Sequence, residues 1–266
     1  MKHWLRRAAA LWIAAVLFAN QAGAAPAISA KRAVVLDAAT GRVLFDHHAE
    51  ARAGMASTTK IMTGLLVAET CALDAPVEIP PEAVGVEGSS LSLEAGEVLR
   101  VETLLYGLML HSGNDAAAAL AIYCDGSVEA FADRMNRRAW ELGLWDTHFV
   151  NPHGLDAQGH YSTALDLARL AAAAMENEVF RQVVSTKTIV LEGRSLTNHN
   201  KLLWQYDGAD GVKTGYTQAT GRILVSSAVR DGRRLIAVTM DDGNDWADHA
   251  ALLDYGFAQL SEDPAR

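Results

Sequence analysis

Residues 57–68 read Ser-Thr-Thr-Lys-Ile-Met-Thr-Gly-Leu-Leu-Val-Ala, a hydroxyl-rich tetrapeptide followed by an apolar run. The run has the length of a helix and almost no polar face, which predicts a helix buried on all sides. Residues three apart share one face of a helix, so Ser57 and Lys60 are predicted to point the same way. A hydroxyl beside an amine at a helix start is the minimum equipment of a serine–lysine acyl-transfer site, whereas a helix-starting serine with a surface lysine is the ordinary alternative.

The first 24 residues have the pattern of an export signal. Residues 1–7 are basic, residues 8–18 are apolar, and Ala22-Gly23-Ala24 offers small residues at a cleavage site. The apolar run is too short for a membrane span, so residues 1–24 are predicted to be a signal peptide and residues 25–266 a single domain. The mature protein is therefore expected to be exported from the cytoplasm, with no stable membrane anchor after cleavage.

Charge and cysteine content exclude several classes of function. The net charge is −9, and removing the three positive charges of Lys2, Arg6 and Arg7 changes it to −12. An acidic chain has no electrostatic attraction for nucleic acid or an anionic membrane, so neither is expected as a partner. Cys71 and Cys124 lie far apart with no Cys-x-x-Cys spacing, so neither a metal site nor a cofactor is expected.

The order of the elements predicts a mixed α+β fold. Residues 33–37 and 42–46 are expected to form one hairpin, and residues 222–229 and 234–240 another, which turns at Asp231-Gly232. The expected helices after the first cover residues 101–110, 115–123, 127–142, 163–175, 178–184 and 248–259, with a strand at 188–191. Strands at both ends of the chain must meet in one sheet, with the helical block inserted between them.

Two further stretches supply partners for Ser57. They are Ser112-Gly113-Asn114, at a turn between predicted helices, and Lys213-Thr214-Gly215, ahead of the C-terminal hairpin. Ser-x-x-Lys, Ser-x-Asn and Lys-Thr-Gly in this order and at these intervals resemble the serine penicillin-recognising enzymes. The chain is similar to the low-molecular-weight penicillin-binding proteins that are D-alanyl-D-alanine carboxypeptidases, from about residue 33 to residue 257. The motifs that carry this resemblance are Ala56-Ser-Thr-Thr-Lys60, Leu108-Met-Leu-His-Ser-Gly-Asn-Asp-Ala116, Asn151-Pro-His-Gly-Leu155 and Gly211-Val-Lys-Thr-Gly-Tyr-Thr217.

The resemblance implies a penicillin-binding protein or β-lactamase-like fold, an antiparallel sheet with helices on both faces and an all-helical lobe. It implies that Ser57 attacks the penultimate D-Ala of a peptidoglycan stem peptide, releases the terminal D-Ala, and is freed from the acyl-enzyme by water. Lys60 is expected to be the base, because burial and the charge of Lys213 favour its neutral form. Ser112 is expected to relay a proton to the leaving amine, and Asn114 to hold either Lys60 or the substrate amide. β-Lactam antibiotics are the expected covalent inhibitors.

The Lys-Thr-Gly stretch is implied to hold the substrate. Lys213 and Thr214 would face its terminal carboxylate, and Gly215 would lie on an edge strand that the substrate backbone approaches closely. The backbone N–H groups of Ser57 and Tyr216 would form the oxyanion hole. The histidines His111, His153 and His199 are expected to be loop or surface residues with no role at this site.

The chain departs from the family pattern in two places. Some members carry an arginine shortly before the last helix that helps to bind the terminal carboxylate, but residues 241–248 contain none. Arg222 is a candidate replacement. Many members also continue into a C-terminal β-rich domain, and this sequence stops where the catalytic domain is expected to end, so no such domain is expected.

Two alternatives remain. A class A β-lactamase shares Ser-x-x-Lys and Lys-Thr-Gly, but it has Asp where this chain has Gly113 and needs a Glu that residues 149–155 lack. Penicillin is therefore expected to acylate Ser57 and leave slowly. The second alternative is a catalytically inactive module that binds peptidoglycan.

The two cysteines are expected at similar depth. Cys71 lies 14 residues beyond Ser57, and Cys124 lies 12 beyond Ser112. If both helices start at the active site and run the same way, the thiols lie ~21 and ~18 Å from it. A disulfide and a pair of small buried thiols are both compatible with this placement.

Overall fold

The central sheet joins the two ends of the chain. The computed structural model describes residues 24–261, so the predicted signal peptide lies outside the described residues except for Ala24. Five antiparallel strands lie in the order β2-β1-β9-β8-β7. Their bounds are Arg32–Asp37 (β1), Val43–His47 (β2), Ala209–Thr217 (β7), Gly221–Arg230 (β8) and Arg233–Met240 (β9). β1 pairs with β9, which confirms the prediction that strands from both ends share one sheet.

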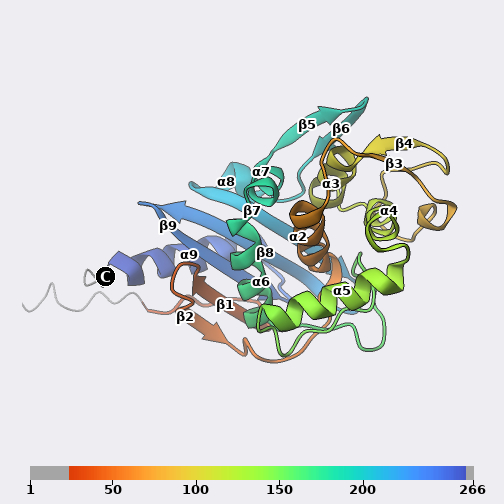
Figure 1. Ribbon diagram of the computed structural model, residues 1–266. Coiled ribbons are helices and arrows are strands. Elements are labelled where there is room, and N and C mark those ends of the chain that lie inside the picture. Colours follow the sequence, from red (N-terminus) through yellow and green to blue (C-terminus); the bar gives the residue numbers. More distant parts are fainter. Residues whose placement is uncertain (1–23, 262–266) are drawn as a thin grey trace, which may run out of the picture.

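The chain between β2 and β7 forms the inserted helical part of the molecule (Figure 1). Its helices are η1 (Ala56–Thr59), α2 (Lys60–Thr70), η2 (Pro81–Ala83), α3 (Val101–Leu110), α4 (Asn114–Asp125), α5 (Val128–Glu141), α6 (Ala164–Glu176), α7 (Glu178–Ser185) and α8 (Leu202–Gln205). Two short hairpins accompany them, β3 (Pro76–Glu78) with β4 (Val98–Arg100), and β5 (Thr188–Leu191) with β6 (Arg194–Thr197). α9 (Asp245–Ser261) follows β9. The mixed α+β class with an inserted helical lobe is confirmed.

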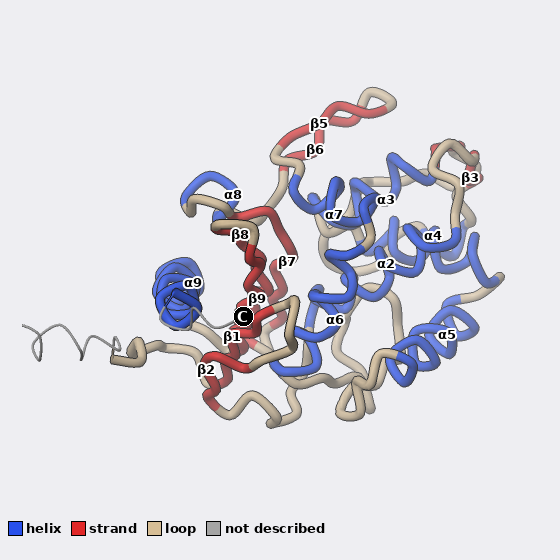
Figure 2. The backbone as a smooth tube through the Cα atoms, turned by 60° about the vertical axis from the view of Figure 1, so that its left-hand side comes forward, coloured by secondary structure: helices blue, strands red, loops and turns tan. Residues whose placement is uncertain are grey.

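Helices cover both faces of the sheet. Successive side chains of a strand point to opposite faces, so Val34 and Val35 of β1 enter different cores. Val35 packs in the smaller core, with Leu235 and with Leu252 of α9. Val34 belongs to the larger core, which continues into the helical lobe. Figure 2 shows α9 on one side of the sheet and α6 on the other.

α2 is the buried helix that the sequence predicts. Residues 60–67 are all buried, so the helix is enclosed by protein and presents no solvated face there. Gly64 allows its neighbours to approach closely, because a Cβ at this position would lie 2.8 Å from Met109 Sδ and 3.2 Å from Phe180 Cε2. This packing against α3 and α7 fixes the position of the helix that begins with Lys60.

The structure differs from the expected elements in small ways. Ser57 lies in η1, one turn of 3-10 helix before α2, rather than in the α-helix itself. The strand β6 and the short helix α8 were not expected. The Lys-Thr-Gly stretch lies on β7, an edge strand as expected for Gly215, and precedes the β8–β9 hairpin. α9 begins three residues earlier than expected.

The two cysteines meet at the far ends of α2 and α4. Cys71 directly follows α2 and Cys124 lies in the last turn of α4, with 3.1 Å between the two sulfur atoms and both thiols free. This confirms the prediction of similar depth. Within residues 24–261, no helix combines the length and the apolar character that crossing a membrane requires.

Candidate active site

Ser57 and Lys60 lie side by side at the junction of η1 and α2. Residues three apart eclipse one another in a 3-10 helix, so the turn brings the two side chains together, with Lys60 Nζ 2.9 Å from Ser57 Oγ. Lys60 is fully buried. The shared face predicted from the spacing is therefore present, although it arises from a tighter turn than an α-helix.

The turn that carries Ser57 is held by hydrogen bonds behind it. The Thr59 hydroxyl donates to the carbonyl oxygen of Ala56 at 2.8 Å, and it lies 2.8 Å from His160 Nε2. Val150 N–H donates to His160 Nδ1, so His160 carries its proton on Nε2 and donates to Thr59. Ala56 has a φ of 45°, a left-handed conformation that needs such support. His160 is a positioning residue that the sequence analysis missed.

Three oxygen atoms surround the amine nitrogen of Lys60. Besides Ser57 Oγ, Lys60 Nζ has two acceptors at 2.6 Å, Asn114 Oδ1 and the backbone carbonyl of His153. Both are oxygen atoms that only accept here. An uncharged amine has two N–H donors and one lone pair, so the two acceptors take both donors and the lone pair remains directed at the Ser57 hydroxyl.

The charges around Lys60 act in the same direction. Burial lowers the pKa of Lys60 well below its usual value, and the positive charge of Lys213 lowers it further. The carboxylate of Asp115 opposes this shift. The Asp115 carboxylate is held by the loop between β3 and β4, where it accepts hydrogen bonds from the backbone N–H groups of Leu91 and Leu93.

The turn between α3 and α4 contributes Ser112 and Asn114. Ser112 is buried and has a φ of 64°, a strained backbone conformation for a residue other than glycine. Its hydroxyl forms no hydrogen bond to other described residues and lies at the wall of the cleft that contains Ser57. The Asn114 amide group donates to the carbonyl of Glu87 through Nδ2, which leaves Oδ1 for Lys60.

β7 brings the Lys-Thr-Gly stretch against the same turn. A Cβ on Gly215 would lie 3.2 Å from the backbone nitrogen of Ser57, so glycine permits the close approach of strand and turn. Lys213 is buried and its Nζ donates to the carbonyl of Thr214. Burial lowers the pKa of Lys213 to about 7. Tyr216 is two-thirds exposed, at 66%.

A cleft of about 310 Å³ lies in front of Ser57. It is lined by Ser57, Ser89, Ser112, His199, Thr214, Gly215, Tyr216, Arg222, Ile223, Asp245 and Trp246. The structure therefore brings most predicted site residues to one cleft, while Lys60, Asn114 and Lys213 lie behind its wall.

The loop histidines contribute more than the sequence analysis anticipated. His153 offers its backbone carbonyl to Lys60, and His199 lines the cleft. Every residue has a backbone carbonyl that can accept a hydrogen bond, so the residue type at position 153 could not reveal this contact with Lys60. Gly154 follows His153 with a φ of 97°, and a Cβ there would lie 1.9 Å from the carbonyl oxygen of Ala56.

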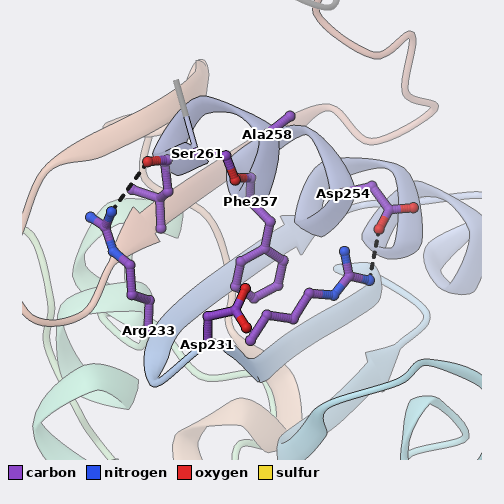
Figure 3. Close-up of a pocket in the computed structure, with 8 residues that line it drawn as sticks. Asp231, Arg233, Asp254, Phe257, Ala258 and Ser261 are labelled. Carbon is purple, nitrogen blue, oxygen red and sulfur yellow. Dashed lines mark hydrogen bonds and ion pairs between the residues drawn. The ribbon is translucent and has the colours of Figure 1, made fainter. Parts of the chain in front are cut away.

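A larger hollow, of about 490 Å³, lies away from this site between the β8–β9 turn and α9 (Figure 3). Three of its four charged side chains are already engaged, since Arg230 pairs with Asp254 and Arg233 donates to the carbonyl of Leu260. The Ser261 hydroxyl donates to the backbone of its own helix. No lysine lines this hollow among the described residues, so it lacks the base that a serine nucleophile needs.

The sheet with its inserted helical lobe and the cleft around Ser57 have the arrangement of the penicillin-recognising class of proteins. The chain belongs to the D-alanyl-D-alanine carboxypeptidase family S11, whose model matches residues 19–244.

Two curated relatives illustrate the match. The chain is 38% identical over 250 residues to D-alanyl-D-alanine carboxypeptidase DacF of Bacillus subtilis (strain 168), covering 88% of this chain and 64% of that protein. It is 40% identical over 230 residues to D-alanyl-D-alanine carboxypeptidase DacD of Escherichia coli (strain K12), covering 81% of this chain and 59% of that protein. The chain thus spans less than two thirds of the length of these relatives.

One solved structure covers a chain of similar extent. The crystal structure of the Streptomyces K15 DD-transpeptidase superposes with a TM-score of 0.84 at 35% sequence identity. The match covers 88% of this chain and 98% of that chain. The sheet with its inserted helical lobe is therefore the fold of this family.

Proposed function

We propose that this protein is a serine-type D-alanyl-D-alanine carboxypeptidase that removes the terminal D-Ala from peptidoglycan stem peptides. One observation carries the proposal most directly. Lys60 Nζ lies 2.9 Å from Ser57 Oγ and has two further oxygen acceptors at 2.6 Å each, so the neutral amine that burial favours can turn its lone pair to the serine hydroxyl and act as a base.

The reaction begins with proton transfer from Ser57 to Lys60. Ser57 Oγ attacks the carbonyl of the penultimate D-Ala as its proton passes to Nζ, and the acyl-enzyme forms as the C–N bond to the last D-Ala breaks. Ser112 passes a proton to the leaving amine. Water then attacks the ester and regenerates Ser57. The nearby charge of Lys213 disfavours a second cation, so Lys60 readily gives the proton up.

The remaining residues bind the substrate. The backbone N–H groups of Ser57 and Tyr216 stabilise the tetrahedral oxyanion, and each such donor contributes ~3 kcal/mol to the transition state. The closeness of Gly215 to the Ser57 nitrogen supports this pairing, since it leaves no side chain between strand and turn. Lys213 and Thr214 face the carboxylate end, and Asn114 keeps Lys60 in place.

The composition of the cleft weighs against a β-lactamase. Deacylation of a penicilloyl enzyme needs a base that activates water, and a glutamate serves this purpose in class A enzymes. No glutamate lines the cleft among the described residues. The protein should therefore react covalently with β-lactams and release the product slowly. A catalytically inactive wall-binding module would have no use for a buried, suitably partnered Lys60.

The proposed cellular location follows from the substrate. Peptidoglycan lies outside the cytoplasmic membrane, and residues 1–24 have the basic, apolar and small-residue order of an export signal. We place the protein in the periplasm or the cell-wall space, with cell-wall peptide and β-lactams as its ligands and no nucleic acid.

The test is D-Ala release from an acylated peptide ending in D-Ala-D-Ala, measured beside penicillin hydrolysis. The parent should release D-Ala and turn penicillin over slowly. Ser57→Ala should abolish both reactions, while Ser195→Ala on the exposed face of β6 should leave them unchanged. Rapid penicillin turnover without D-Ala release would overturn the assignment in favour of a β-lactamase. A parent that binds cell wall but releases no D-Ala would indicate a binding module.

A further inference from the structure

Arg222 lies on the central sheet beside the Lys-Thr-Gly stretch of β7, where the proposed function puts the substrate's carboxylate end. It lies on β8 directly opposite Tyr216 of β7, and paired residues of antiparallel strands share a face. Thr214, two residues along β7, lies on that face as well. Arg222 is exposed and lines the cleft together with Thr214 and Tyr216.

The guanidinium of Arg222 is not committed to a protein partner. It forms no hydrogen bond and no ion pair with the described residues, unlike Arg230 at the other end of β8, which pairs with Asp254. The carboxylate that acts on it electrostatically is Asp245, a buried residue at the start of α9. Asp245 accepts only the backbone N–H of Trp246, so it can orient Arg222 without occupying its donors.

Lys213, the cation of the Lys-Thr-Gly stretch, is less suited to the task. Lys213 is 1% exposed and already donates to the Thr214 carbonyl. Its pKa is lowered to about 7 by burial, so near neutral pH it carries only part of its charge. An arginine stays charged at every physiological pH and offers a planar pair of donors that matches a carboxylate.

We propose that Arg222, supplied by β8, is the principal ligand of the substrate's terminal carboxylate. This inference rests on the proposed carboxypeptidase function and deepens it. Thr214 provides the neighbouring hydroxyl, and Lys213 acts mainly behind the wall of the cleft, on the charge of Lys60. The carboxylate contact thus comes from the sheet, whereas the start of α9 presents an acid.

The test compares two acylated D-alanyl thioesters that differ only in the leaving group. One leaves as thioglycolate, which carries a carboxylate, and the other as the uncharged thioglycolamide. Thioesters are reactive enough that the hydrolysis rates of both substrates can be measured, by following the fall in thioester absorbance. Arg222→Gln should lower kcat/KM for the carboxylate substrate about 10- to 100-fold, largely through KM, because a charge-assisted hydrogen bond is lost. The amide substrate should change less than about threefold.

Two further variants sharpen the comparison. Arg222→Lys keeps the charge without the planar fork and should fall between the parent and Arg222→Gln. Arg137→Gln on the exposed face of α5 makes the same change in net charge away from the cleft and should match the parent.

The outcomes separate this inference from the proposed function. An unchanged preference for the carboxylate substrate in Arg222→Gln, or an equal loss on both substrates, overturns the assignment of Arg222 while leaving the enzyme class intact. A parent that turns over neither thioester and releases no D-Ala overturns the proposed function itself.

A second inference rests on a separate observation, the meeting of Cys71 and Cys124. Their sulfur atoms lie 3.1 Å apart in the structure. Each ends a helix whose other end is at the active site, since α2 begins with Lys60 and α4 with Asn114. Those two residues are themselves joined at 2.6 Å, between Nζ and Oδ1. A bond between the thiols would therefore tie the two helices together at both ends.

We infer that Cys71 and Cys124 form a disulfide in the exported protein. The S–S bond forms as both thiols lose their protons, and the two electrons pass to a disulfide-containing oxidant of the exported compartment, which is reduced to its dithiol. The bond closes a loop across a sequence separation of 53 residues. A loop of that length should raise Tm by roughly 5–15 °C relative to the reduced protein.

Alkylation and mass spectrometry test this inference. Protein equilibrated with a mostly oxidised glutathione couple should be 2 Da lighter than the reduced form and should take up no alkylating reagent. Reductant should lower the Tm of the parent and leave that of Cys71→Ser and of Cys124→Ser unchanged. Two thiols that still alkylate after equilibration would overturn the inference, as would a Tm that does not respond to reductant.

Discussion

Replacing Asn114 with aspartate should raise the pKa of the proposed base Lys60 and keep its amine protonated up to a higher pH. The new carboxylate would lie about where Asn114 Oδ1 now lies, 2.6 Å from Lys60 Nζ. At that distance and an effective dielectric constant of ~20, the attraction is about 6 kcal/mol, equal to roughly four to five pKa units. Burying the carboxylate offsets part of this, so we expect the pKa of Lys60 to rise by at least ~2 units, which reduces its neutral fraction about 100-fold at any pH well below the parental pKa.

The assay is the rate of penicillin acylation as a function of pH. Acylation needs neutral Lys60, so the rate rises with pH through the Lys60 pKa, and Asn114→Asp should move this rise upward by about 2 units or more. On the acidic limb of the profile the rate should fall about 100-fold, and it should recover as the pH rises through the new pKa. Asn136→Asp is the matched control, since Asn136 also bridges backbone groups, at Phe149, but lies away from Lys60. A low rate with an unshifted pH profile would refute the role of Lys60 as base.

Two further predictions concern the supports of the site and the stability of the sheet. Gly154→Ala would put a Cβ 1.9 Å from the Ala56 carbonyl oxygen at a φ of 97°, so penicillin acylation should fall about 100-fold or more. A parent-like acylation rate would show that Gly154 does not set the position of Ser57. Buried His249 lies between the hydroxyls of Ser226 and Thr239, and burial lowers its pKa to about 3. In the unfolded chain the imidazole of His249 binds a proton below pH ~6.5, whereas in the folded protein it stays neutral. The free energy of unfolding is therefore at its full value above pH ~6.5 and is smaller by about 2 kcal/mol at pH 5. Urea unfolding at pH 7 and pH 5 measures this loss of stability, and His249→Gln should show a smaller loss than the parent. An equal loss in the two proteins would contradict the assignment of the effect to His249.

The parts of the site that the sequence predicted are those set by local spacing. Ser57 and Lys60 share a face because they are three residues apart, whether the turn is α or 3-10. Gly215 was placed on a strand that must approach something closely, and its neighbour proved to be the Ser57 turn. The roles of Ser112 and Tyr216 remain predictions.

The parts that could not be predicted depend on contacts between distant segments. His160 reaches Thr59 across a separation of 101 residues, and the carbonyl of His153 reaches Lys60 across 93. A backbone acceptor has no residue type to reveal it. The β5–β6 hairpin was missed for a local reason. Its turn has positive φ at both Glu192 and Gly193, and glutamate is not a residue that such turns favour.

The central claim is that Ser57 is the nucleophile and that its acylation depends on Lys60. The most direct measurement is to incubate the protein with labelled penicillin, digest it, and locate the modified residue by mass spectrometry. We expect a single label, on Ser57. Neither Lys60→Met nor Ser57→Ala should take up the label, at any pH tested. A label on any other residue, or labelling of Lys60→Met at the parental rate, would contradict it.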